Sequence, residues 1–157
     1  MNNSAARRLL RAGITTGIVD GLFSGILAQF FYGSTAVRLF QGVAATLLGN
    51  AALEGGARTA AIGLAMHFGV AFGWSAVFLA IVAASARIRG VLARPAGAVR
   101  VAAVFGPAVW MTMSLVVIPM LVRRPPTINY RWCVQLVGHF PFVGLPIVTA
   151  IGRRPLG

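Results

Sequence analysis

Residues 13–25 read GITTGIVDGLFSG and place one aspartate, Asp20, inside an apolar stretch that runs from Leu9 to Tyr32. At 1.5 Å per residue, about 20 helical residues cross the ~30 Å hydrocarbon layer of a bilayer. The stretch is therefore long enough to span a membrane. Because a lipid-exposed backbone has to satisfy its own hydrogen bonds, we expect this segment to be an α-helix.

The composition of the whole chain is that of a membrane protein. Of its 157 residues, 58% are hydrophobic and only 10% are charged, and the mean hydropathy is +0.84. Ordinary soluble domains carry about 25% charged residues. The 14 basic residues are all arginines, opposed by two acids, and they cluster at the ends of apolar runs, where lipid head groups lie. This placement predicts contacts with membrane lipids and argues against a nucleic-acid partner.

Four apolar segments predict four transmembrane helices, over residues 9–32, 60–84, 99–121 and 132–151. A shorter stretch over residues 35–49 has apolar side chains at helical spacing, so we expect a helix that lies in the interface or re-enters the bilayer. The predicted fold is an all-α membrane protein with a single transmembrane domain, residues 1–157. Its four transmembrane helices form a bundle of two helical hairpins.

An internal repeat favours the hairpins. The motif LAMHF around His67 recurs as LVGHF around His139, and the spacing of Arg11 and Gly17 recurs in Arg100 and Gly106. Repeats of this kind occur in transporters whose halves are related by an axis along the membrane normal. We therefore expect the two hairpins to be parallel copies of one unit.

The arginines also predict the orientation of the chain. Nine of them fall on the side that holds both termini, and five fall on the other side. Cytoplasmic loops carry the excess of basic residues. We expect a multi-pass protein of the bacterial inner membrane with both termini in the cytoplasm. The nine are Arg7, Arg8, Arg11, Arg87, Arg89, Arg94, Arg100, Arg153 and Arg154.

Gly13, Gly17, Gly21 and Gly25 recur at every fourth position and form one ridge on the first helix. A ridge without side chains lets another helix approach closely. Two interpretations are open: the ridge packs against a helix of the same chain, or it is a surface for another subunit. Asp20 lies at the edge of this face, so its side chain is expected to point toward protein.

Asp20 is also deep, roughly 15 Å from the cytoplasmic boundary. An ionised carboxylate at that depth is costly unless it is partnered or beside water. His67 and His139 are the candidate partners in a buried polar cluster. Three interpretations are open: hydrogen bonds that fix the helix register, a proton or ion path, and haem ligation by the two histidines.

The sequence offers one further pair of charged residues and no catalytic motif. Glu54 and Arg58 are expected to form an ion pair in the outer loop. No nucleophile with a base, no metal-binding cluster and no phosphate-binding loop is recognisable in the sequence. We therefore expect neither an enzyme nor a metal site, and no cofactor apart from the haem alternative.

The sequence resembles a family of small, four-segment bacterial inner-membrane proteins without an established activity. The resemblance lies in the runs VRLFQGVAATLLG (37–49), ALEGG (52–56), GLAMHF (63–68) and VGLPI (143–147). More distantly, the chain is similar to the YagU-like inner-membrane proteins. The resemblance implies a bacterial membrane protein and implies no mechanism.

Two functions follow as hypotheses. The favoured one is a structural or accessory subunit, either a homo-oligomer or part of a larger assembly such as a respiratory or photosynthetic complex. The alternative is a small proton, ion or solute channel or carrier that uses Asp20 with His67 and His139. The first is favoured because the polar groups are few.

Overall fold

The computed structural model describes residues 3–152, which are helical with short connections and contain no strand. Four helices are long and apolar enough to cross a membrane, which confirms that prediction. They run over Ser4–Phe31, Gly56–Ala84, Gly97–Val122 and Tyr130–Gly152. Each begins two to five residues before the expected start and ends within one residue of the expected end. The starts differ because helices extend beyond the apolar runs from which they were predicted.

Three of the four long helices contain a π-helical turn, and one is a continuous α-helix. The first long helix is α1 (Asn3–Ile26) and ends in the π turn η1 (Leu27–Phe31). The second is α3 (Gly56–Ala84), which is continuous. The third is α5 (Gly97–Thr112), η3 (Met113–Val117) and α6 (Ile118–Val122). The fourth is α7 (Tyr130–His139), η4 (Phe140–Gly144) and α8 (Leu145–Gly152). Prolines lie in or next to the last two π turns, since proline cannot continue the ladder of helical hydrogen bonds.

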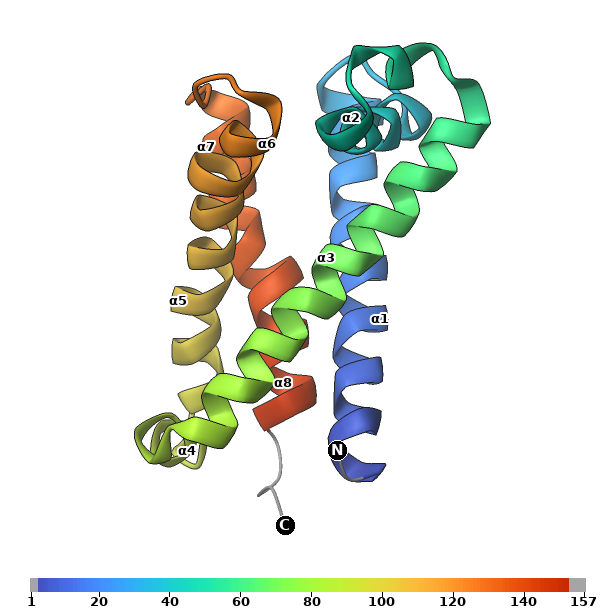
Figure 1. Ribbon diagram of the computed structural model, residues 1–157. Helices are drawn as coiled ribbons and strands as arrows, with labels where there is room; N and C mark the ends of the chain where they lie inside the picture. The colour runs from blue at the N-terminus through green and yellow to red at the C-terminus, as the bar shows by residue number, and fades with distance from the viewer. Residues whose placement is uncertain (1–2, 153–157) are drawn as a thin grey trace.

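The chain folds into two groups of helices that meet along α8 (Figure 1). α1 packs against α3, and α5 packs against α7 and η4, while α8 contacts both α1 and α5. The N-terminus and the end of α8 lie at the same end of the molecule. We call this the terminal end and the opposite one the loop end.

A shorter helix, α2 (Ala36–Leu48), lies at the loop end and packs mainly against α3 (Figure 1). The Thr35 hydroxyl accepts a hydrogen bond from the Arg38 backbone N–H, which caps the start of α2. The helix ends at Gly49, whose φ of 75° suits glycine. Gly63 has no side chain at the point where α3 meets the Phe40 carbonyl group, so the two backbones touch.

A helix that the sequence did not indicate, α4 (Ala86–Leu92), occupies part of the connection between α3 and α5. The Ser85 hydroxyl caps it by accepting from the Ile88 N–H at 3.3 Å. Arg89 donates to the carbonyl groups of Val82 and Ala83, both at 2.8 Å. These bonds satisfy two carbonyl groups in the last turn of α3, and they hold α4 against the end of α3.

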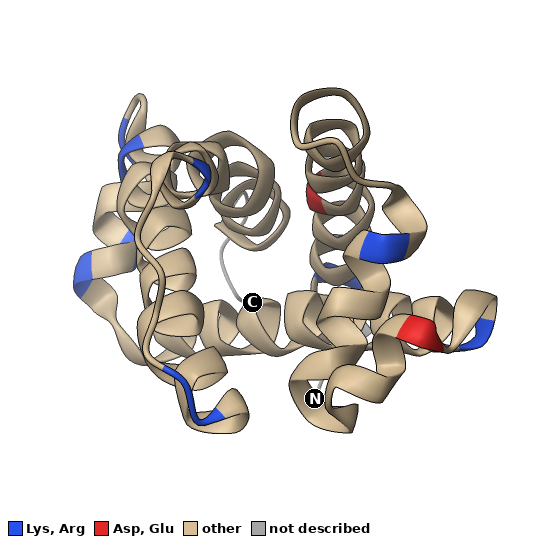
Figure 2. Ribbon diagram, turned by 90° about the horizontal axis from the view of Figure 1, so that it is seen from above, with Lys and Arg blue, Asp and Glu red and all other residues tan. Residues whose placement is uncertain are grey.

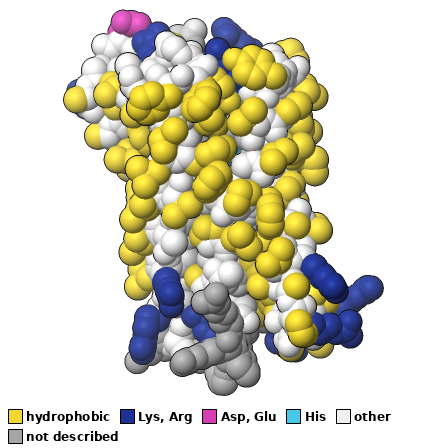
Figure 3. Space-filling model, turned by 180° about the vertical axis from the view of Figure 1, so that it is seen from behind, with side chains coloured by type: hydrophobic (Ala, Val, Ile, Leu, Met, Phe, Trp, Pro, Cys, Tyr) yellow, Lys and Arg dark blue, Asp and Glu magenta, His cyan; other side chains and the backbone are white. Residues whose placement is uncertain are grey.

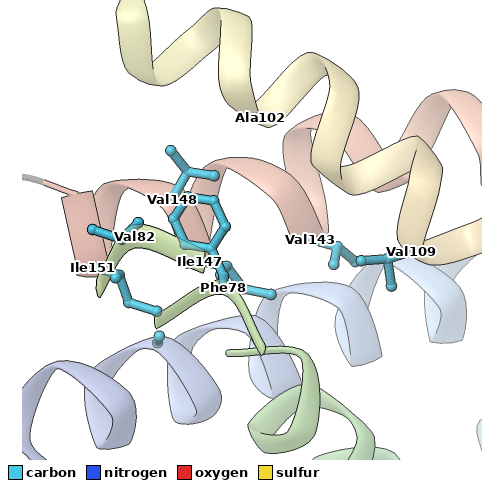
Figure 4. Close-up of a cluster of buried hydrophobic side chains, with 9 residues drawn as sticks. Phe78, Val82, Ala102, Val109, Val143, Ile147, Val148 and Ile151 are labelled. Carbon is cyan, nitrogen blue, oxygen red and sulfur yellow. The ribbon is translucent and has the colours of Figure 1, made fainter. Parts of the chain in front are cut away.

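The apolar core lies in the terminal half of the molecule (Figure 4). Phe78 of α3 and Ile147, Val148 and Ile151 of α8 are at most 1% exposed. They pack with Ala12, Val82, Ala102, Val109 and Val143, which come from α1, α3, α5 and η4. This half of the bundle is therefore closed by tightly packed side chains.

The surface matches a membrane environment. Large apolar side chains such as Leu22, Phe30 and Val104 are exposed. On the face shown in Figure 3, the arginine side chains lie at the two ends and apolar side chains cover the middle. Seen from above, arginines lie on loops and on helices of both groups (Figure 2). Arg153 and Arg154 lie outside the described residues.

Candidate functional site

A cavity of about 250 Å³ lies between the two groups of helices, on the loop-end side of the core. We call it the central cavity. It brings together the three residues predicted to form a polar cluster, although they come from α1, α3 and α7. Its polar lining consists of Thr16, Asp20, Ser24, His67, Gln135 and His139. The rest of its wall is apolar or aromatic, including Phe40, Val70, Trp74 and Val143.

Asp20 sits near the middle of its helix, roughly 17 Å from the nearer end at Phe31. Its side chain is 14% exposed, and its Oδ2 atom lies 4.0 Å from Nδ1 of His67. The other ring nitrogen of His67, Nε2, lies 3.0 Å from the carbonyl oxygen of Gly17. Since a carbonyl oxygen can only accept, Nε2 carries a hydrogen and donates it.

The tautomer of His67 decides what lies between it and Asp20. With its hydrogen on Nε2, a neutral His67 presents a bare lone pair at Nδ1 to the carboxyl group. A lone pair facing an ionised carboxylate is repulsive, whereas a proton on either residue makes the approach favourable. At 4.0 Å the two atoms are beyond direct hydrogen-bond distance, so the structure shows a close approach of an acid and a histidine and no hydrogen bond between them.

His139 reaches the central cavity from the last residue of α7, directly before the π turn η4. Its Nδ1 donates to the Gln135 carbonyl oxygen at 2.7 Å, so Nε2 is the nitrogen left for another group. The ring packs against Trp110, with centroids 4.8 Å apart. Gly106 has no side chain where α5 meets the His139 carbonyl group, which allows α5 and α7 to approach this closely.

Several polar atoms around the central cavity have no hydrogen-bond partner. Of the five such buried side-chain atoms in residues 3–152, four belong to cavity-lining residues: Thr16 Oγ1, Asp20 Oδ1, Trp110 Nε1 and Gln135 Oε1. Buried polar groups in proteins are normally paired, and an unpaired one costs about 1–3 kcal/mol. The central cavity therefore has hydrogen-bonding capacity that the described residues leave unused.

A second cavity, of about 450 Å³, lies at the loop end. We call it the outer vestibule. Its rim is formed by exposed residues between Arg124 and Asn129. Trp110, Ile118 and Gln135 line both cavities, so these three side chains separate the vestibule from the central cavity.

The glycine ridge of α1 faces helices of the same chain. Side chains from α3 fill three of its positions: Phe72 lies against Gly13, Phe68 against Gly17 and His67 against Gly21. Gly25 faces Ala36 of α2. The ridge thus sets the distance between α1 and α3 and places His67 beside Asp20.

The ion pair expected between Glu54 and Arg58 takes a different form. Glu54 Oε1 lies 3.4 Å from Nη1 of Arg38, which also donates to the Leu53 carbonyl oxygen at 2.5 Å. The first turn of α2 brings Arg38 next to the 3-10 helix η2 (Asn50–Glu54). Arg58 lies on α3, beyond a turn at Gly56 with φ of 59°, and the structure gives it no part in this pair.

Two residues of the site were missed from the sequence. Gln135 lies four residues before His139, on the same helix face, and its Nε2 donates to Ser24 Oγ at 3.4 Å. That spacing is a signal that could have found it. Trp110 had no such signal, because tryptophan is common at the ends of membrane helices.

The geometry bears on the haem alternative through His67. Its Nε2 is bonded to the Gly17 carbonyl oxygen, so this nitrogen is not available as a haem ligand in the observed arrangement. Within residues 3–152, no group of three or more His, Cys, Asp or Glu side chains is placed to hold a metal ion.

The site thus consists of one deep carboxyl group, two histidines and an incompletely hydrogen-bonded cavity. Comparison of the chain with protein families, with curated proteins and with solved structures finds no match.

Proposed function

We propose that this chain is a proton-coupled carrier of a small solute in the bacterial inner membrane, and not an enzyme. Asp20 and His67 hold the proton, and His139 offers Nε2 to the solute or to water. The observation that carries this proposal is that Asp20 Oδ2 lies 4.0 Å from His67 Nδ1, with both side chains at most 15% exposed and both on helices long enough to span a membrane. Ionisable groups buried in a span are a recurrent feature of proton relays.

The two ends of the central cavity differ in a way that suits a carrier. Toward the terminal end, the cavity is bounded by the core around Phe78, Ile147 and Ile151, whose side chains are at most 1% exposed. Toward the loop end, only Trp110, Ile118 and Gln135 stand between the cavity and the outer vestibule. Alternating access requires such a site with one sealed side and one thin side, which exchange roles during transport.

The proposal includes the two-hairpin arrangement and its orientation. α1 with α3 form one hairpin, and α5 with α7 and α8 form the other. In each half a glycine of one helix lies close to a histidine of the next. The His67 ring bonds to the Gly17 carbonyl oxygen in one half, and Gly106 lies against the His139 backbone carbonyl in the other. Both termini lie in the cytoplasm, so the loop end is outside.

α2 is interfacial, which is supported by its exposed apolar side chains, such as Val37 and Leu47. Membership of the four-segment inner-membrane family is part of the same proposal.

Proton uptake into proteoliposomes tests the function. The purified chain is reconstituted with a trapped pH-sensitive dye, and an inward proton gradient is applied together with candidate solutes, which are added outside one at a time. Protein-dependent uptake is the excess of the initial rate over that of empty vesicles given the same solute. We expect Asp20→Asn to abolish protein-dependent uptake, because an amide cannot bind the proton. Glu54→Gln is the matched control, since Glu54 is the other acid and lies at the surface. Equal uptake by the parent and by Asp20→Asn would overturn the proposal.

We also propose, as a second candidate, an accessory subunit that packs against another membrane protein or a second copy. One observation favours it: a face of α3 carries small residues that are exposed although the helix is apolar. These are Ala61, Ala65, Gly69, Gly73, Ala76 and Ala80. Small residues allow close helix approach. Extraction in a gentle detergent followed by mass measurement tests it, and recovery solely as a monomer contradicts it.

A further inference from the structure

The outer vestibule has the chemistry of an anion site. Two arginines line it, Arg124 and Arg131, and no acidic side chain does. The one acid at this end, Glu54, is paired with Arg38 instead. Within residues 3–152, Arg124 has neither an ion pair nor a side-chain hydrogen bond. Its positive charge is therefore uncompensated by the protein.

Neighbouring side chains hold the second guanidinium in place. Arg131 lies over the Tyr32 ring at 4.5 Å and near the Tyr130 ring at 5.7 Å, and its Nε donates to the Tyr130 hydroxyl at 3.0 Å. The aromatic rings lie against the face of the guanidinium, and the Tyr130 hydroxyl accepts the hydrogen bond of its Nε–H group. Its terminal N–H groups stay free to donate to a bound oxyanion.

Neutral donors complete the vestibule. The Tyr32 hydroxyl and Trp110 Nε1 are both buried without a hydrogen-bond partner in the described part of the chain. Burial raises the pKa of the Tyr32 hydroxyl above its ordinary value of 10.0, neighbouring Tyr130 raises it further and Arg131 opposes them. The hydroxyl therefore keeps its proton at neutral pH and can donate it in a hydrogen bond.

Both vestibule arginines are exposed, and their surroundings distinguish them from another exposed arginine at the same end. Arg58 lies at the same end and lines neither the vestibule nor the central cavity, as a solvated interfacial arginine would. Arg124 and Arg131 differ from it, because they share a cavity of about 450 Å³ with unpaired buried donors.

We propose that the outer vestibule binds the oxyanion group of an amphiphilic acid, with Arg124, Arg131 and the Tyr32 hydroxyl as its ligands. The inference rests on the proposed function for its purpose: the carried solute is a small organic acid with an apolar body, which fits the largely apolar wall of the central cavity. An anion that crosses with the proton of Asp20 and His67 moves without net charge. That pairing removes most of the cost of bringing a charge into hydrocarbon.

Two sources supply this chemistry, a free carboxylate and an anionic lipid head group, and the experiment separates them. In one arm, radiolabelled benzoate is equilibrated with the full chain in an uncharged maltoside micelle. In the other, the chain is extracted from vesicles that contain phosphatidylglycerol, and the retained lipid is measured by mass spectrometry. The variants are Arg124→Gln, Tyr32→Phe, which keeps the ring under Arg131, and Arg58→Gln as the matched control.

We expect saturable benzoate binding that Arg124→Gln weakens by about tenfold or more, because a charged hydrogen bond is lost. Tyr32→Phe weakens it less, and Arg58→Gln leaves it unchanged. Loss of retained phosphatidylglycerol in Arg124→Gln, but not in Arg58→Gln, supports the oxyanion site with lipid as the source. Equal behaviour of Arg124→Gln and Arg58→Gln in both arms overturns the inference.

Failure of this inference is distinguishable from failure of the carrier proposal. If Asp20→Asn stops proton uptake while Arg124→Gln changes neither arm, the vestibule assignment falls and the proton site stands. If Arg124→Gln weakens binding while Asp20→Asn leaves uptake intact, the oxyanion site stands and the coupling to proton movement falls.

Discussion

His67 joins the backbone of α1 to the carboxyl group of the same helix. Its Nε2 lies 3.0 Å from the Gly17 carbonyl oxygen, and its Nδ1 lies 4.0 Å from Asp20 Oδ2. The first contact holds the ring in place, and it leaves the second nitrogen facing the carboxyl group. In the carrier that we propose, this nitrogen and the carboxyl group are the two positions for the proton.

The Asp20 and His67 pair acts as one unit in the carrier proposal. We expect Asp20→Asn and His67→Gln each to abolish proton uptake, and the double variant to be no worse than either. The reason is that both single changes remove the same shared proton. Initial uptake rates in proteoliposomes measure this. Partial and additive losses in the two single variants would show that the residues act separately.

Replacing Gly17 with leucine tests the ridge between α1 and α3. The new side chain meets the Phe68 ring, so α1 and α3 have to separate. We expect a loss of about 1–3 kcal/mol in the free energy of unfolding, measured by equilibrium unfolding in mixed micelles. Gly69→Leu is the control, because an atom added at Gly69 meets nothing within 4 Å. A similar loss in both variants would mean that packing at the ridge does not set the effect, since leucine has the higher helix propensity at both positions.

The hydrogen bond between Trp132 and Ser114 predicts a second stability effect. Trp132 Nε1 donates to Ser114 Oγ at 2.9 Å and ties α7 to η3. We expect Ser114→Ala to cost about 0.6–1.7 kcal/mol, the range for hydrogen bonds between membrane helices. The control is Thr112→Ala, because the Thr112 hydroxyl bonds back to Ala108 of its own helix. If Ser114→Ala is equally costly when Trp132 is phenylalanine, the bond does not contribute.

Cysteine labelling tests the orientation. Cys133 is the single native cysteine, so the Cys133→Ser chain provides a background without thiols. In intact bacterial cells, a membrane-impermeant maleimide should label Thr127→Cys in the loop before α7. It should label Ala93→Cys, in the connection after α4, only after the membrane is permeabilised. The reverse pattern would place both termini outside.

The four spans were predictable because hydropathy and length are local properties of the sequence. The short helix α2 was predictable for a similar reason, since its cap at Thr35 and its end at Gly49 are encoded within the segment. Helix α4 was missed because its stability depends on Arg89 reaching the last carbonyl groups of α3. The partner of Glu54 could not be predicted, because two arginines lie near it in the sequence. The path of the backbone around Gly56 determines that Glu54 pairs with Arg38 and not with Arg58.

The sequence alone determined that this chain belongs in a bilayer, and that Asp20 lies deep in the first helix on its glycine-rich face. Both follow from the cost of placing charge in hydrocarbon and from the period of the α-helix. The tertiary structure decided what surrounds that carboxyl group. Gln135 and Trp110 line its cavity, and the core around Phe78 closes one side of it. These contacts join residues far apart in the chain, and only the packing of whole helices fixes which side chains meet.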